Sequence, residues 1–230
     1  MTPSNDASAP AHNPRLELPC VTLVAIDGTA NTDATVASLA RADALVTFGK
    51  VLCFSPVRPA APEWVESWEW IEIPPTTLKG YNQFCLAQLH AYIATSHSLT
   101  VHSDSRIVNP AAWDNRWLEY DYIGAPWRPG HTGTLDRVGN SGFCLRSKRL
   151  LEATAPLPNE SYVWRGTVKQ GCRDDVITCV MYRAHLESLG LRFAPVEVAA
   201  RFAWESPTPE APELSDQFGT HEYRRRRRAT

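Results

Sequence analysis

The sequence lacks the features that identify several common classes of protein. Its six cysteines form no C-x-x-C pair, and Cys53, Cys85 and Cys144 lie inside apolar runs, so we expect neither a zinc site nor a disulfide framework. No apolar run is long enough to cross a membrane. No apolar segment of the secretory type occurs in the first fifteen residues, MTPSNDASAPAHNPR. We therefore expect a cytoplasmic protein.

Signatures of nucleotide-binding proteins and hydrolases are missing as well. The first predicted strand is not followed by G-x-G-x-x-G, and the chain contains neither G-x-x-x-x-G-K-[ST] nor G-x-S-x-G. These absences argue against a standard dinucleotide site, a P-loop and an α/β-hydrolase. A net charge of −2 provides no global field that would attract nucleic acid or a membrane.

What the chain does contain is the composition of a soluble globular domain. Of its 230 residues, 43% are hydrophobic and 21% are charged. Residues 1–17 are rich in Pro, Ala, Asn and Ser, so we predict a disordered tail there, a single domain over residues 18–222, and a basic tail over residues 223–230. The basic tail is either simply solvated or makes weak contact with an anionic surface through five arginines: Arg224, Arg225, Arg226, Arg227 and Arg228.

Hydrophobic patterning predicts an α/β fold that opens with a β-α-β unit. Residues 20–26 read as a buried parallel strand, residues 34–45 as a helix and residues 50–54 as a second strand. Further strands are expected at residues 68–73, 99–102, 143–146 and 193–198, and further helices at residues 83–95, 148–153 and 176–189, with residues 156–173 irregular and residues 206–212 a linker. We predict one Rossmann-like domain whose mixed, mostly parallel central sheet is flanked by helices.

Aromatic side chains gather after the strand at residues 99–102, around Trp113, Trp117 and Tyr120. Such density suits a platform for a sugar or a base, and it suits a wall of the core equally well. We favour the core interpretation.

Carboxylates occur where predicted strands end. Asp27 follows the first strand, Asp104 follows the strand at residues 99–102, and Asp121 precedes an aromatic loop. In open α/β sheets the ligand crevice lies at this edge. Asp104 together with His221 suits a divalent cation, because carboxylate oxygen and imidazole both bind manganese-like metals. The alternative is that Asp104 caps a turn and that His221 is solvated.

Asp174 and Asp175 form an acidic pair at the start of a predicted helix. Such a pair opposes the helix dipole, which is a sufficient structural reason for it. Alternatively, one of the two acids is a general base that deprotonates an acceptor hydroxyl.

The order of the motifs resembles the GT-A class of nucleotide-sugar glycosyltransferases and, within it, a glycosyltransferase-like family of unknown function. The resemblance covers roughly residues 18–222, and its segments are VTLVAID, KGYNQFCLAQLHAYIATSHSLTVHSDSRIVNP, YDYIGAPW, VGNSGFCLRSKRLL, RDDVITCVMYRAHLESLGLRFAPVEVAARFAWE and FGTH. It implies transfer of a sugar from a nucleoside diphosphate to an acceptor hydroxyl, with inversion if Asp174 or Asp175 is the base. The acceptor can be a glycan, a lipid or a protein.

The resemblance also implies roles for individual residues. Asp104 and His221 would hold Mn²⁺ or Mg²⁺ at the donor diphosphate. The segment HSDSR has only one acid of the usual D-x-D pattern, and Arg106 would replace part of the missing charge. Donor-binding roles fall to Asp27, Lys79, Tyr81, Asn82, Asp104, Arg106, Gly139, Asn140 and Gly142. The alternatives are a non-catalytic sugar- or nucleotide-binding relative and an adaptor that works through its arginine tail.

Overall fold

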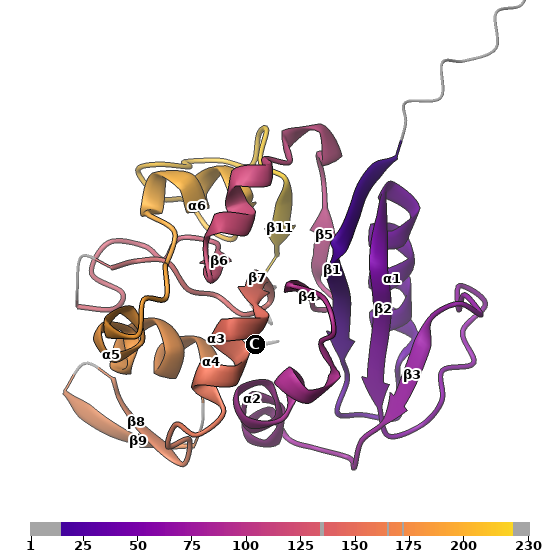
Figure 1. The fold of residues 1–230 in the computed structure, drawn as a ribbon, viewed down its shortest axis with the longest axis horizontal. Coiled ribbons are helices and arrows are strands. Elements are labelled where there is room, and N and C mark those ends of the chain that lie inside the picture. Colours follow the sequence, from indigo (N-terminus) through magenta and orange to yellow (C-terminus); the bar gives the residue numbers. More distant parts are fainter. Residues whose placement is uncertain (1–14, 134–135, 165, 172, 223–230) are drawn as a thin grey trace, which may run out of the picture.

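A computed structural model describes residues 15–133, 136–164, 166–171 and 173–222 of the chain. These residues form the expected α/β fold, with a mixed six-stranded sheet in the order β3-β2-β1-β4-β7-β6 (Figure 1). The strands of this sheet are β1 (Leu16–Ile26), β2 (Val46–Ser55), β3 (Glu69–Glu72), β4 (His97–Val101), β6 (Tyr122–Gly124) and β7 (Phe143–Ser147). Strands β3, β2, β1 and β4 run parallel, whereas β7 is antiparallel to both β4 and β6.

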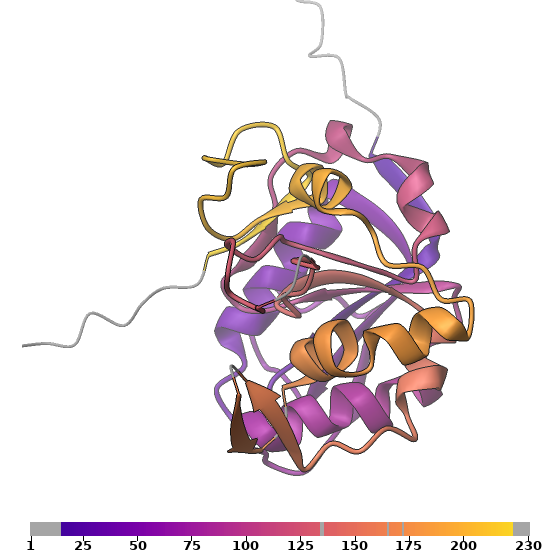
Figure 2. The ribbon, with the colours of Figure 1, turned by 90° about the vertical axis from the view of Figure 1, so that its left-hand side faces the viewer.

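Helices cover both faces of this sheet. Figure 2 shows α2, α4 and α5 on one side and α6 on the other. The α-helices are α1 (Asp33–Leu45), α2 (Leu78–Ala87), α3 (Lys148–Thr154), α4 (Asp174–Val176), α5 (Arg183–Ser188) and α6 (Val196–Phe202). The shorter turns are three 3₁₀ segments, η1 (Leu89–Tyr92), η2 (Pro110–Ala112) and η3 (Asn115–Glu119), and one π segment, η4 (Ile177–Met181).

Strand β1 shows why a near-continuous apolar run predicts a doubly covered strand. Val24 and Ile26 belong to the apolar cluster that includes Phe84 of α2, whereas Leu23 belongs to the cluster that includes Leu39 of α1. Because alternate side chains of a strand point to opposite faces, both faces of β1 are buried. The predicted β-α-β opening is confirmed.

A second, smaller sheet joins the end of the described chain to the region after β4. It has the order β10-β11-β5, with β10 (Ala203–Trp204) parallel to β11 (Gly219–His221) and β5 (Ser105–Ile107) antiparallel to it. Figure 1 shows β11 and β5 beside β7 near the middle of the molecule. His221 is therefore placed next to a turn more than a hundred residues earlier in the sequence.

Several predicted elements are wrong in type or in length. Residues 193–198 form an isolated bridge at Phe193 and then helix α6, which begins after Pro195, rather than a strand. Residues 156–173 include the antiparallel hairpin β8 (Ser161–Trp164) and β9 (Thr167–Gln170). The helix predicted at residues 83–95 starts earlier, at Leu78, because Thr77 caps it by accepting a hydrogen bond from the backbone N–H of Gly80.

The ends of the chain and the aromatic cluster also bear on the predictions. Residues 16 and 17 belong to β1 and not to a tail, while residues 1–14, Cys172 and the arginine tail lie outside the described residues. Trp117 is 1% exposed and packs against Phe202 and Phe218, which confirms the core interpretation. Among the described residues, no helix has both the length and the apolar character that a membrane span requires.

Candidate functional site

A cavity of about 380 Å³ lies at the carboxyl ends of the parallel strands β1 and β4. This is the edge of an open α/β sheet at which ligands bind. The residues that line it are mostly small, hydroxylated or ionisable: Ile26, Asp27, Gly28, Thr29, Thr35, Thr76, Thr77, Leu78, Tyr81, His102, Ser103 and Asp104.

The floor of the site is the turn after β4, which carries His102 and Asp104. Because β4 pairs with β7 at Val101 and Phe143, His102 follows beside Gly142, whose carbonyl accepts its N–H at 3.0 Å. Ser38 of α1 donates its hydroxyl to the carbonyl oxygens of His102 and Ser105, at 2.8 and 2.9 Å. The turn is thus fixed by hydrogen bonds from two elements.

Strand β11 brings His221 to this turn. In the register of the small sheet His221 lies opposite Ser105, and its Nε2 is 3.3 Å from Oδ1 of Asp104. Gly142 makes this approach possible, because a Cβ at that position would overlap the imidazole ring of His221. A side chain larger than hydrogen at position 142 would therefore have to displace the ring of His221.

His102, Asp104 and His221 together present three metal-ligating side chains. One ligand atom from each lies within 4.8 Å of the other two. Two imidazole nitrogens and one carboxylate oxygen are donors that divalent transition metals accept, so the residues fit the ion that the resemblance implies. Glu205, the residue after β10, places its Oε1 3.5 Å from Nδ1 of His221.

The charges in this cluster are strongly coupled. Burial alone would lower the pKa of His221, but Asp104 and Glu205 outweigh burial and raise the pKa to about 9. Burial, followed by the positive charge of His221, lowers the pKa of His102 to about 4. Burial opposes the shift at Asp104, yet His221 holds the pKa of that carboxyl below its ordinary value. At neutral pH without a metal, His221 is an imidazolium between two carboxylates and His102 is neutral.

Helix α2 connects this cluster to the acidic pair. Tyr81 contacts Nε2 of His102 through its hydroxyl, at 2.7 Å, and its ring meets the imidazole edge to face. At the next residue of the helix, Oδ1 of Asn82 accepts the backbone N–H of Asp174 at 3.0 Å. The same helix therefore positions a cavity wall and the start of α4.

The two acids of the pair are in different environments. Asp174 is fully buried and accepts a hydrogen bond at 2.6 Å from Arg146 of β7, which is also buried. Asp175 is half-buried and accepts the N–H of Val176. Burial, and then the charge of Asp174, raise the pKa of Asp175 to about 6, with a smaller contribution from Glu205. Asp175 is thus the acid of the pair with a carboxyl group poised near neutral pH.

The remaining predicted donor-binding residues divide into those that shape the cavity and those outside its lining. Asp27 lines it, but both carboxylate oxygens accept hydrogen bonds from Thr29 or Thr35, so the side chain also holds the loop after β1. Lys79 is exposed on the first turn of α2. Arg106 is paired with Glu222 at 2.5 Å and is not part of the cavity lining, and its role at the phosphates stays a prediction.

The loop before β7 packs against protein groups. A Cβ at Gly139 would overlap the ring of Trp127, just as one at Gly142 would overlap His221. Asn140 has a φ of 66° and accepts the N–H of Gly142 with its side-chain oxygen. The two glycines are thus closely approached by a tryptophan and by the imidazole of the site, and their role at the donor stays a prediction.

Sequence reasoning did not assign His102, Arg146 or Glu205 to the site. The H-x-D spacing at the end of a buried strand was a usable signal for His102. The sequence contained no such signal for Arg146 or Glu205. A single charged residue in an apolar strand, or after a strand of only two residues, does not indicate which distant residue it will contact.

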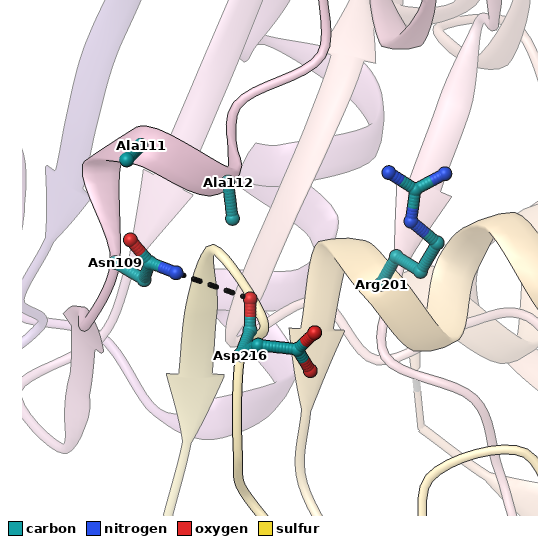
Figure 3. A pocket seen from close by; sticks show the side chains of 5 residues that line it. All are labelled: Asn109, Ala111, Ala112, Arg201 and Asp216. Carbon is teal, nitrogen blue, oxygen red and sulfur yellow. Dashed lines mark hydrogen bonds between the residues drawn. The ribbon is translucent and has the colours of Figure 1, made fainter.

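A second cavity, of about 220 Å³, lies between η2, α6 and the loop before β11 (Figure 3). Its lining contains Asn109, whose side-chain N–H donates to the carbonyl of Asp216, and Arg201. None of the predicted site residues lines it.

Comparison with solved structures finds partial overlaps of architecture. The galactosyltransferase LgtC, solved with donor and acceptor sugar analogs, is 11% identical with a TM-score of 0.46, covering 90% of this chain and 87% of that one. The bifunctional IspDF from Campylobacter jejuni is 11% identical with a TM-score of 0.43, covering 60% of this chain and 43% of that one. The apo-form glycosyltransferase GlyE of Streptococcus pneumoniae TIGR4 is 12% identical with a TM-score of 0.39, covering 84% and 47%. This chain therefore spans less than half the length of IspDF and of GlyE.

No curated protein matches the sequence. A family match does exist, and it includes the turn after β4, the acidic pair and His221. Residues 68–221 match the family described as Protein of unknown function (DUF5672), and because the match covers more than half of the chain, the protein belongs to this family.

Proposed function

We propose that this protein is a glycosyltransferase of the GT-A type, which moves a sugar from a nucleoside diphosphate to an acceptor hydroxyl. The observation that supports the proposal is a cavity at the strand ends with a His–Asp–His donor set beside it, together with an acid of raised pKa, Asp175, which does not line the cavity but is linked to it through α2. The resemblance of the sequence motifs to this class supports the same assignment.

The cavity is the proposed binding site of the donor nucleotide. Thr29, Thr76 and Thr77 offer hydroxyl and backbone groups along one wall, and Leu78 and Tyr81 offer apolar surface. This mixture of a few polar groups and an apolar wall is typical of small-molecule sites. At the floor, His102, Asp104 and His221 would hold a divalent cation, which would stabilise the negative charge of the departing diphosphate.

Asp175 is the proposed general base. In the transfer, the acceptor oxygen bonds to the anomeric carbon, the bond from that carbon to the phosphate oxygen breaks, and its electron pair leaves with the diphosphate. The proton of the acceptor hydroxyl passes to the carboxylate of Asp175. Its pKa of about 6 leaves it mostly ionised at pH 7 and more basic than an ordinary carboxylate. Direct displacement of this kind inverts the anomeric configuration.

Asp174 has a positioning role in this proposal. Its carboxylate is committed to Arg146, and its backbone N–H is committed to Asn82. It fixes the start of α4 and raises the pKa of its neighbour by its charge. Retention of configuration in the product would remove Asp175 from the role of base.

The proposal is tested by a thermal-shift screen of nucleoside diphosphates and their sugars, with and without Mn²⁺ or Mg²⁺. A ligand present at about 100 times its dissociation constant should add roughly 2.7 kcal/mol to the unfolding free energy. Asp104→Asn should abolish the metal-dependent part of that shift, while Asp216→Asn, an exposed acid at the second cavity, should not change it. A metal-dependent shift that survives Asp104→Asn would contradict the metal assignment, and binding without any turnover would favour a non-catalytic relative.

A further inference from the structure

We propose that this site selects a divalent transition metal, such as Mn²⁺, Co²⁺ or Zn²⁺, over Mg²⁺, and that His102 is the residue that sets the preference. The inference deepens the proposed function, on which it rests for the role of the ion. It concerns the ion itself, so it can be measured without a nucleotide.

The donor set is the first reason. The cluster contains two imidazoles, from His102 and His221, and a single carboxylate, from Asp104. Mg²⁺ favours oxygen ligands and keeps several waters, whereas imidazole suits the later divalent metals. Two histidines and one carboxylate that leave other positions open form a known arrangement for divalent transition metals. An all-oxygen D-x-D site would lack this bias.

The orientation of the two rings is the second reason. Nε2 of His102 is engaged by the hydroxyl of Tyr81 at 2.7 Å, which leaves Nδ1 of that ring for an ion. Nδ1 of His221 faces Glu205 at 3.5 Å, which leaves Nε2, the nitrogen beside Asp104. Histidines that bind metals usually have their other ring nitrogen held by such a partner. Tyr81 is such a partner for His102, whereas Nδ1 of His221 is near Glu205 without a hydrogen bond to it.

The rigidity of the surroundings is the third reason. The ring centroids of His102 and His221 are 5.4 Å apart and nearly perpendicular, and the close approach of Gly142 confines the ring of His221. The turn that carries His102 and Asp104 is fixed by Ser38. The three donors are thus held close together in the folded protein, so little ordering is needed when an ion binds.

The test is isothermal titration of the full chain, without a histidine tag and without nucleotide, using Mg²⁺, Mn²⁺, Co²⁺ and Zn²⁺ in turn. The wild-type protein should bind Co²⁺ and Zn²⁺ far more tightly than Mg²⁺, and bound Co²⁺ should give a visible absorption band that reports nitrogen ligation. His102→Gln should weaken Co²⁺ binding by more than the roughly 10–100-fold that the loss of an outer hydrogen-bond partner costs. His185→Gln, which changes an exposed histidine on α5, should leave both readouts unchanged.

His102→Asp is the decisive variant, because it changes the segment from H-S-D to D-S-D. It should narrow the ratio of Co²⁺ to Mg²⁺ affinity and change the Co²⁺ spectrum, with circular dichroism confirming that the variant is folded. Should His102→Asp misfold, Tyr81→Phe gives a second measurement, with an expected loss of roughly 10–100-fold in Co²⁺ affinity and little change for Mg²⁺. Equal affinities of the wild type for Mg²⁺ and Co²⁺, or a Co²⁺ spectrum untouched by these substitutions, would overturn the inference.

These outcomes are separable from the fate of the proposed function. Selective metal binding with no nucleotide binding would contradict the glycosyltransferase and keep the metal inference. Nucleotide binding by a protein that binds Mg²⁺ and Co²⁺ equally well would support the proposed function and contradict the metal inference.

Discussion

Removal of charge from Asp174 and from Asp175 should have opposite effects on stability, although the two residues are neighbours. Asp174→Asn leaves the guanidinium of Arg146 buried without its carboxylate, since the two side chains are 0% and 4% exposed. Loss of one partner from a buried ion pair typically costs about 3–5 kcal/mol. We expect Asp174→Asn to lower the unfolding free energy by an amount of this order.

Asp175→Asn should be neutral or stabilising at pH 7. The pKa of Asp175 is raised to about 6 by burial and by Asp174, so ionisation of this carboxyl opposes folding. The penalty is absent below pH 4, grows as the pH rises from 4 to 6, and is constant above that, with a ceiling of about 3 kcal/mol. Asparagine retains the oxygen that accepts the N–H of Val176 and avoids the penalty.

Urea unfolding followed by circular dichroism at pH 5 and pH 7 distinguishes the two effects. Any stability that Asp175→Asn gains over the wild type should be larger at pH 7 than at pH 5, and Asp174→Asn should be less stable at both. Asp216→Asn, at an exposed position, serves as the control and should change stability by less than about 0.5 kcal/mol. A wild-type-like Asp174→Asn, or an Asp175→Asn that is markedly less stable at pH 7, would refute the reasoning.

Three further predictions concern the cluster and its surroundings. The pKa of His221 is raised to about 9, so its contribution to stability is fully present below pH 6.5 and is lost as the pH rises through 9; urea unfolding in EDTA should show about 3 kcal/mol of this dependence, and His221→Gln should remove it. Gly142→Ala should displace the imidazole of His221, at a cost of about 1–3 kcal/mol, and weaken Co²⁺ binding in the same titration that tests the metal inference; unchanged binding would show that the ring tolerates a methyl group. Arg106→Ala breaks a half-exposed ion pair with Glu222 and should lower the unfolding free energy by no more than about 1 kcal/mol, without changing the thermal shift that nucleoside diphosphates produce. Loss of that shift would show that Arg106 binds the diphosphate.

The parts of the fold that could be predicted are the strands whose apolar pattern indicates burial on both faces, and the side chains that directly follow such strands. The apolar run at residues 20–26 predicts a doubly covered strand, and Asp27 and Asp104 follow strands that end at one edge, so both line the same cavity. Such predictions need only neighbouring residues, because a buried strand appears in the sequence as an apolar run and its end as the first polar residue after that run.

Pairings between distant segments leave weaker traces. Glu205 reaches His221 through strands of two and three residues, too short for any periodicity to show. Arg146 lies in a buried strand, and nothing in its neighbours indicates Asp174 as its partner. Residues 193–198 are apolar and β-branched enough to predict a strand, yet Pro195 starts helix α6, whose Phe202 packs against Trp117. In each of these examples, the partner or the secondary structure is determined by packing between segments that are distant in the sequence.

Consumption of a nucleotide sugar by the purified protein tests the central claim most directly. With Mn²⁺ and a donor that gives a thermal shift, the wild-type protein should release nucleoside diphosphate in the presence of a suitable acceptor. Asp175→Asn should bind that donor equally well and release its product about 10²–10⁴-fold more slowly. A wild-type protein that neither binds nor consumes any donor in a broad panel, or an Asp175→Asn variant with full activity, would contradict the account.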